Sequence, residues 1–383
     1  HSEGGNSAGF FFQNQTGPAT DFAGNELIGG QNNDMVRLTP GNDLVDGSEA
    51  LVGSDVDTLF VGNAVKIESG DGFFTVTGTG SGADTLSNME KVVATNGNFF
   101  LVGNGGYATL QEAIDAAADG DTIVLADEVF TGDVTVNKGV TIIGANNQGI
   151  SGDSLMRGSE SVIDGELTIT TTARVVIDGV KFLNDDDYTL SINDNYVAVK
   201  VLANASASSG GHLITNSVFL RDPATDPMGF NPTAFAGSNA QPTHRAIEIA
   251  KVSMGSAVVV SNNLIASEND FVYAGDGWRS GVYSNGGDGV TLITGNTFEN
   301  VRGALNLDDF GTTVSVTGND FASAGSAISI GGTPANASNL ASISGNTFGR
   351  VDTDFNGQGL GVTQPVVLDI AALGGPAEGT QVI

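Results

Sequence analysis

Three of the few basic residues in this chain are spaced so that they could bind one anion together. His244, Arg279 and Arg302 each come three residues before an apolar position that recurs along the sequence. If these apolar positions belong to neighbouring strands of one parallel sheet, the three side chains lie ~5 Å apart from strand to strand. Two bare cations at that distance repel by roughly 3 kcal/mol at an effective dielectric of ~20. We therefore expect an anion among them, either an acidic side chain of the protein or the carboxylate of a bound uronic acid.

Aromatic, amide and acidic side chains lie near these cations in the sequence. The candidates on the predicted strands are Glu248, Tyr283, Asn306 and Asp308, and those in the largest local insertion are Tyr273 and Trp278. The carboxylates would balance the cations, and the aromatic rings of the insertion would stack on sugar rings. This set predicts a ligand-binding groove on one face of the sheet. The alternative is an ordinary solvated face, on which the arginines pair with acidic neighbours.

A second group of residues, near the N-terminus, suggests metal binding. Its members are acidic and lie among glycines and asparagines: Asp34, Asp43, Asp46, Asp55 and Asp57. Carboxylate oxygens on glycine-rich turns are ligands that calcium prefers. The sequence therefore favours a calcium site in this region, although plain Asx turns would use the same residues.

The strands that must position these residues are indicated by a repeated six-residue phrase. Each copy joins a β-branched residue to a Gly or Asn bend and then to a large apolar residue: Val260–Ile265, Ile293–Phe298, Val316–Phe321 and Ile343–Phe348. Successive copies begin 33, 23 and 27 residues apart. This spacing indicates a unit of roughly two dozen residues with loops inserted in some copies, which is typical of a stacked, solenoid-like fold. Unrelated hairpins of a β-sandwich, the alternative fold, have no reason to keep one frame.

Two columns of side chains should run along the axis of such a stack. Phe298, Phe321 and Phe348 would stack inside it. The asparagines of the phrase would pass amide hydrogen bonds from coil to coil at the bend. These asparagines are Asn263, Asn296, Asn319 and Asn346.

The clearest helix in the sequence precedes the repeats. Thr109 and Glu112 form a capping-box pattern at its start, and Gly120 predicts its end. Short β-branched strands with Gly, Asn or Asp at the corners follow. This order resembles the entry to a right-handed parallel β-helix of the pectin-lyase-like superfamily. The resemblance covers residues 104–370 and implies an all-β solenoid capped by a short α-helix, but no particular activity, because the superfamily holds lyases, hydrolases, epimerases and adhesins.

The acidic turns resemble the calcium-binding nonapeptide of RTX proteins, in a degenerate form. Asn32 replaces the middle glycine of that motif, and successive copies do not keep a nine-residue phase. We therefore expect three parts. They are a Gly/Asp-rich β region that binds calcium at 1–103, the β-helix at 104–370, and a C-terminal tail or cap at 371–383.

The composition restricts the partners. The chain of 383 residues has 14 basic and 44 acidic side chains, and its net charge of −30 disfavours nucleic acid and anionic membranes. It has no cysteine, which excludes disulfides and thiolate sites, and no apolar run long enough for membrane insertion. We expect a protein of the extracellular space or cell surface, with acidic polysaccharide or other cell-surface components as partners and self-association left open.

Two functions fit these features. The first is a secreted bacterial cell-surface, matrix or adhesion-type structural protein that binds acidic polysaccharide. The alternative, implied by the resemblance, is a polysaccharide lyase or C5-epimerase acting on a uronate-containing glycan. In that alternative a basic side chain would neutralise the substrate carboxylate while Tyr283 or His244 moves the proton. No catalytic motif of the superfamily is matched residue by residue, so the catalytic residues stay unassigned.

Overall fold

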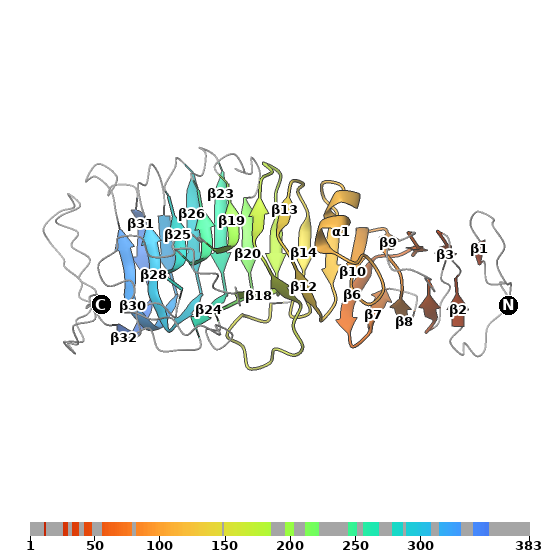
Figure 1. Ribbon diagram of the computed structural model, residues 1–383, viewed down its shortest axis with the longest axis horizontal. Coiled ribbons are helices and arrows are strands. Elements are labelled where there is room, and N and C mark those ends of the chain that lie inside the picture. Colours follow the sequence, from red (N-terminus) through yellow and green to blue (C-terminus); the bar gives the residue numbers. More distant parts are fainter. Residues whose placement is uncertain are drawn as a thin grey trace, which may run out of the picture.

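The protein is an elongated stack of β-coils, with β1 (Phe11–Phe12) at one end and β32 (Thr347–Val351) at the other (Figure 1). The computed structural model describes the following residues: 11–12, 26–29, 33–37, 42–47, 56–78, 82–147, 149–184, 196–202, 211–221, 244–250, 256–267, 278–285, 289–307, 314–330 and 340–351. Among these residues, no helix is both long enough and apolar enough to cross a bilayer.

The longest sheet, called sheet 1, has thirteen strands and runs from one end of the stack to the other (Figure 1). In spatial order its strands are β1 (Phe11–Phe12), β3 (Met35–Arg37), β5 (Thr58–Phe60), β9 (Lys91–Ala94), β10 (Gly97–Val102), β11 (Thr122–Leu125), β14 (Thr141–Ile143), β17 (Val176–Asp178), β20 (His212–Thr215), β23 (Ala257–Ser261), β26 (Val290–Thr294), β29 (Val314–Thr317) and β31 (Leu340–Ser344). All neighbouring strands of sheet 1 pair in parallel, except β9 and β10, which are antiparallel.

A fourteen-stranded sheet forms the other two sides of the coils. One side, stack 2a, contains β12 (Val129–Thr131), β15 (Val162–Asp164), β18 (Lys181–Asn184), β21 (Val218–Arg221), β24 (Leu264–Ser267), β27 (Thr297–Glu299) and β32 (Thr347–Val351). The other, stack 2b, contains β13 (Val134–Val136), β16 (Leu167–Ile169), β19 (Val197–Val201), β22 (Arg245–Ile249), β25 (Ser280–Ser284) and β28 (Val301–Leu307). The long strand β30 (Asp320–Ile330) pairs with both stacks and joins them.

Each coil therefore passes through sheet 1, stack 2a and stack 2b in turn, as β20, β21 and β22 do before β23 begins the next coil. The strands pair in register with the equivalent strands of the coils before and after. This is a parallel β-helix, as the repeated phrase predicted.

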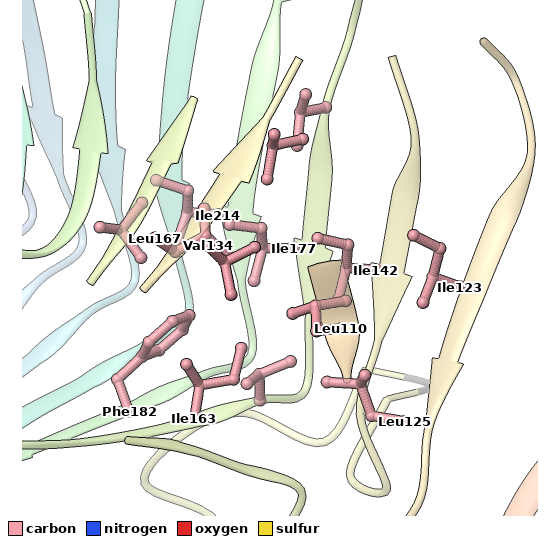
Figure 2. Close-up of a cluster of buried hydrophobic side chains, with 14 of the residues drawn as sticks. Leu110, Ile123, Leu125, Val134, Ile142, Ile163, Leu167, Ile177, Phe182 and Ile214 are labelled. Atoms are coloured by element: carbon pink, nitrogen blue, oxygen red, sulfur yellow. The ribbon is translucent and has the colours of Figure 1, made fainter. Parts of the chain in front are cut away.

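The interior is filled by one apolar row from each side of the coil. In sheet 1 the row is β-branched and pairs directly from strand to strand, for example Ile142 with Ile177 and Ile177 with Ile214. Figure 2 shows these side chains on successive strands, facing Ile163 and Phe182 of stack 2a. β-Branched residues suit this position because they pack well on a pleated surface.

The predicted phenylalanine stack is confirmed. The rings of Phe298 and Phe321 lie 5.1 Å apart and within 9° of parallel, and those of Phe321 and Phe348 lie 5.1 Å apart at 13°. Phe182 and Phe219 form an earlier pair at 4.8 Å. Phe298 and Phe321 are fully buried.

The asparagine column is confirmed as well. The side-chain amide of Asn263 donates to the side-chain oxygen of Asn296 at 2.9 Å, and Asn296 to Asn319 and Asn319 to Asn346 at 3.0 Å each. Each of these oxygens also accepts the backbone amide of the preceding asparagine. At the bend between sheet 1 and stack 2a, the backbone and side-chain amides of these asparagines thus find acceptors on the next coil.

The predicted helix is α1 (Leu110–Ala116), and it carries the capping box between Thr109 and Glu112. Leu110 and Ile114 are buried, and Figure 2 shows Leu110 among the apolar side chains of the interior. The helix ends at Ala116, earlier than predicted, and Gly120 uses its positive φ of 94° in the turn that follows.

The N-terminal strands continue the stack. Sheet 1 is continuous across the boundary expected between residues 103 and 104, because β10 pairs in parallel with β11 from Phe99 to Val102. Beside it lies a five-stranded sheet, sheet 3, with strands in the order β2 (Glu26–Ile28), β4 (Leu44–Asp46), β8 (Ala83–Ser87), β7 (Phe73–Gly78) and β6 (Val65–Gly70).

Candidate functional site

Stack 2b brings the predicted groove residues onto neighbouring coils in the predicted register. Glu248 on β22 pairs with Tyr283 on β25, and Tyr283 pairs with Asn306 on β28. The same row extends one coil back to Lys200 on β19, which pairs with Glu248. These four side chains alternate with buried neighbours, all apolar except Ser284, so they lie on the outer face of the strands.

A second row, at the beginning of the same strands, contains the arginines. The backbone amide of Arg279 donates to the carbonyl of His244 at 2.9 Å, and that of Arg302 to the carbonyl of Trp278 at 2.9 Å. These bonds place the two arginines on adjacent coils. Burial lowers the pKa of Arg302 below its usual value, and the charge of Arg279 adds to this effect. The two guanidinium groups are thus close enough to repel.

Arg245 links the two rows. Its Nη1 donates to Glu248 at 2.5 Å, and its guanidinium lies 3.7 Å from the centre of the Tyr283 ring. Glu248 also lies 3.9 Å from the ammonium group of Lys200. With Lys200 on β19, Arg245 on β22, Arg279 before β25 and Arg302 on β28, four consecutive coils each present a basic side chain.

The prediction that Trp278 stacks on a sugar from the loop is wrong. Trp278 is fully buried, its indole N–H donates to the carbonyl of Phe219 at 3.2 Å, and its ring stacks on Tyr196 at 6.1 Å. The large apolar ring of Trp278 is thus buried in the stack, and the hydrogen bond to Phe219 satisfies the indole N–H. The predicted Tyr273 and Asp308 lie outside the described residues.

The assignment of His244 to the cationic group is also wrong. Its side chain is buried, and Nδ1 contacts the Nη1 of buried Arg221. Burial, and secondly the charge of Arg221, lower the pKa of His244 to about 2. The imidazole is therefore neutral at physiological pH, and it is too deeply buried to take a proton from a polysaccharide.

The N-terminal carboxylates bind backbone amides of neighbouring coils. Asp57 accepts from the amide of Asp34 at 2.6 Å, and Glu90 accepts from the amide of Asp57 at 2.6 Å. In sheet 3, Asp84 accepts from the amide of Asp43 at 2.9 Å. These carboxylates accept backbone amides from strand to strand, as the asparagine side chains do in the later coils.

The described acidic residues do not form a calcium cage. Asp34, Asp43 and Asp57 are buried, and half-buried Asp46 accepts from the side chain of Asn88 at 2.7 Å. Within the described part of the chain, no three acidic or histidine side chains converge on one point. Asp55 lies outside the described residues.

The sequence reasoning missed Lys200 and Arg245 as members of the site. Lys200 was detectable, because Val199 and Val201 flank it as Ile247 and Ile249 flank Glu248. The spacing of 48 residues between Lys200 and Glu248, about twice the coil repeat, obscured this match. Arg245 carried no such signal, since its reach towards Glu248 and Tyr283 depends on the bend at the start of β22.

No protein-family model and no curated protein matches the chain. A comparison with solved structures finds a mutant of a PL6-family alginate lyase, with 13% sequence identity and a TM-score of 0.29. The alignment covers 86% of this chain and 58% of that one, so the chain spans less than two thirds of the lyase structure. At this level of similarity, no conclusion about activity is drawn from it.

Proposed function

We propose that the protein is an extracellular surface, matrix or adhesion-type β-helix that binds an acidic polysaccharide along stack 2b. The observation that carries this proposal is the set of basic side chains on four consecutive coils: Lys200, Arg245, Arg279 and Arg302. The whole chain has only 14 basic residues and a net charge of −30. Such a concentration on one face favours a local anionic ligand.

The spacing of the coils suits a polyuronate. Neighbouring strands lie ~4.8 Å apart, a distance comparable to one hexuronate unit. A chain laid along the axis of the stack would present carboxylates to cations on successive coils. Tyr283 and Asn306 supply hydrogen-bonding groups between the cations. The rest of the negative surface repels the glycan, so binding should be confined to this face and weakened by salt.

Binding without turnover is favoured by the burial of His244. Of the two residues expected to move a proton, His244 is neutral and buried, which leaves half-exposed Tyr283. The alternative, a uronate-specific lyase or C5-epimerase, would therefore depend on Tyr283 next to the Arg245 guanidinium. Incubation with alginate and polygalacturonate tests it, since a lyase forms unsaturated ends that absorb ultraviolet light and an epimerase exchanges the C5 proton with solvent.

The binding proposal is tested with the double variant Arg279→Ala/Arg302→Ala. We expect it to lose retention in affinity electrophoresis through alginate or polygalacturonate gels, while its circular dichroism stays that of the wild type. The matched control, Lys66→Ala/Lys181→Ala, removes the same charge from sheet 3 and stack 2a. Equal retention of the two double variants would refute the proposed site.

Calcium binding stays a separate proposal. The described carboxylates bind backbone amides, so any ion would require additional ligands beside them. An ion that binds only the folded protein raises its stability by RT ln(1 + [L]/Kd). Millimolar calcium should then raise the melting temperature, and a chelator should lower it. Equal melting temperatures under both conditions would refute calcium binding.

A further inference from the structure

Glu248 occupies a position on stack 2b that the proposed function gives to a carboxylate of the glycan. One oxygen of Glu248 accepts from the Nη1 of Arg245 at 2.5 Å, and the other lies 3.9 Å from the ammonium group of Lys200. Lys200 on β19 and Glu248 on β22 are direct partners in the sheet. A carboxylate of the protein itself therefore lies between cations of two consecutive coils, as a bound uronate would.

The three side chains of this group are partly covered. The side-chain exposure is 36% for Lys200, 16% for Glu248 and 23% for Arg245. Water and salt screen such a group less than a fully exposed one, so the charges within it offset one another. Two cations and one anion leave a single net positive charge at this place, whereas two positive charges would face a ligand without Glu248.

Arg245 is held in place from a second side as well. Its guanidinium lies 3.7 Å from the centre of the Tyr283 ring, and a cation is attracted to the face of an aromatic ring without the help of a carboxylate. If the Glu248 carboxylate turns away, the guanidinium should therefore stay over Tyr283. It would then present to a ligand carboxylate the N–H group that Glu248 had accepted from.

We infer that Glu248 is an internal counter-ion that competes with the glycan for Lys200 and Arg245 and thereby limits how tightly stack 2b binds a polyuronate. The inference rests on the proposed function and concerns the regulation of the same site. A glycan carboxylate reaches these two cations only when the Glu248 carboxylate leaves them, so the new contact replaces an ion pair instead of adding one. Lys200 and Arg245 thus contribute less to binding than their charges alone predict.

The variant Glu248→Gln tests this inference in affinity electrophoresis, with retention in alginate and polygalacturonate gels measured relative to a gel without glycan. Gln keeps the length of the side chain and removes its charge. We expect the dissociation constant to be roughly two- to fivefold lower than that of the wild type at low salt, the range of one partly exposed ion pair. Glu299→Gln is the matched control, because it removes the same charge from β27 on stack 2a and should be retained like the wild type.

A double-mutant cycle separates competition from a general change of charge. Arg245→Gln removes one positive charge in either background, but in the wild type Glu248 already offsets that charge. The substitution should therefore weaken glycan binding more in the Glu248→Gln background than in the wild type. Equal losses in the two backgrounds would mean a uniform electrostatic effect and would overturn the inference.

Failure of this inference is distinguishable from failure of the glycan proposal. If the wild type is retained and Glu248→Gln is retained equally or less, with the circular dichroism of the wild type, then Glu248 does not compete and only this inference falls. If Glu248→Gln is retained and the wild type is not, the internal counter-ion is confirmed and the glycan proposal falls for the wild type. If neither protein is retained at low salt, both fall.

Discussion

The burial of two single residues, His244 and Trp278, changes which side chains of the candidate site are available to a ligand. His244 and Trp278 occupy sequence positions that pointed to the solvent, yet both are buried, and each contacts β21: His244 the side chain of Arg221, and Trp278 the backbone of Phe219. Both lie directly before a strand of stack 2b, His244 before β22 and Trp278 before β25. At such a position the packing against β21, rather than the local strand alternation, determines which side of the backbone is covered.

Asp84 is the residue whose titration should be visible in stability. Burial raises its pKa to about 6, and the charge of Asp43 adds to this, while the hydrogen bond from the Asp43 amide opposes it. Because the folded pKa lies above the ordinary value of 3.8, protonation favours the folded state. This stabilisation is complete below about pH 4 and is lost as the pH rises through 6.

The variant Asp84→Asn tests this directly. It keeps an oxygen for the Asp43 amide and removes the buried charge, whose Oδ2 has no hydrogen-bond partner among the described residues. We expect urea unfolding at pH 7 to show a gain of up to about 3 kcal/mol over the wild type, and no gain at pH 3.5. A gain of the same size at both pH values would exclude titration as its cause.

Phe321 tests the internal stack. It is fully buried between Phe298 and Phe348, with ring separations of 5.1 Å on both sides. Truncation to Ala should cost about 3–5 kcal/mol in the free energy of unfolding, because the coils above and below cannot close the cavity. Phe348→Ala should cost less, since Phe348 is only partly buried. Equal losses for the two variants would mean that the stack does not extend as described.

At the scale of elements, the sequence predicted the contacts that each coil makes with the equivalent positions of the coils before and after it. The phenylalanines and asparagines recur because a side chain inside a solenoid lies against its own equivalent one coil away, so one pattern is repeated in every coil. Residues 149–160 form an arm that follows β14 and is hydrogen-bonded to later coils, and this arm has no such equivalent. Its contacts join Gly152 and Asn262, which are 110 residues apart in sequence, and no local pattern announces them.

Gly152 tests whether the arm is fixed by close backbone contact. A Cβ at Gly152 would lie 2.2 Å from the amide nitrogen of Leu264 and 2.3 Å from the carbonyl oxygen of Ser217. Gly152→Ala should therefore detach the arm and raise the rate of proteolysis near Leu155, with little change in global stability. Gly158→Ala is the control, because nothing lies within 4 Å of its Cβ. Equal resistance of both variants to proteolysis would show that the arm accommodates the added methyl group and stays attached.

At the scale of the whole molecule, charge separates the three sides of the coil. Stack 2b carries four basic side chains on consecutive coils. The strands β20, β23, β26, β29 and β31 of sheet 1 contain no Asp, Glu, Lys or Arg, and stack 2a carries both basic and acidic residues, among them Lys181 and Glu299. The sequence indicated Arg279 and Arg302 through their register but not Lys200 and Arg245, and the uncharged strands of sheet 1 became apparent only once they were placed next to one another. The proposed glycan binding on stack 2b should weaken with salt, because it depends on these partly exposed charges.

The continuity of sheet 1 leads to a prediction about the boundary expected between residues 103 and 104. β10 supplies Phe100, Leu101 and Val102 to the core and covers the edge of β11. A chain that begins at residue 104 would expose the amides and carbonyls of Thr122–Leu125 as an open parallel edge, which is a template for pairing with other chains. We expect this shortened chain to aggregate or to melt well below the full-length protein, as measured by light scattering during thermal unfolding. A soluble fragment with the melting temperature of the full chain would instead establish residues 104–370 as an independent folding unit.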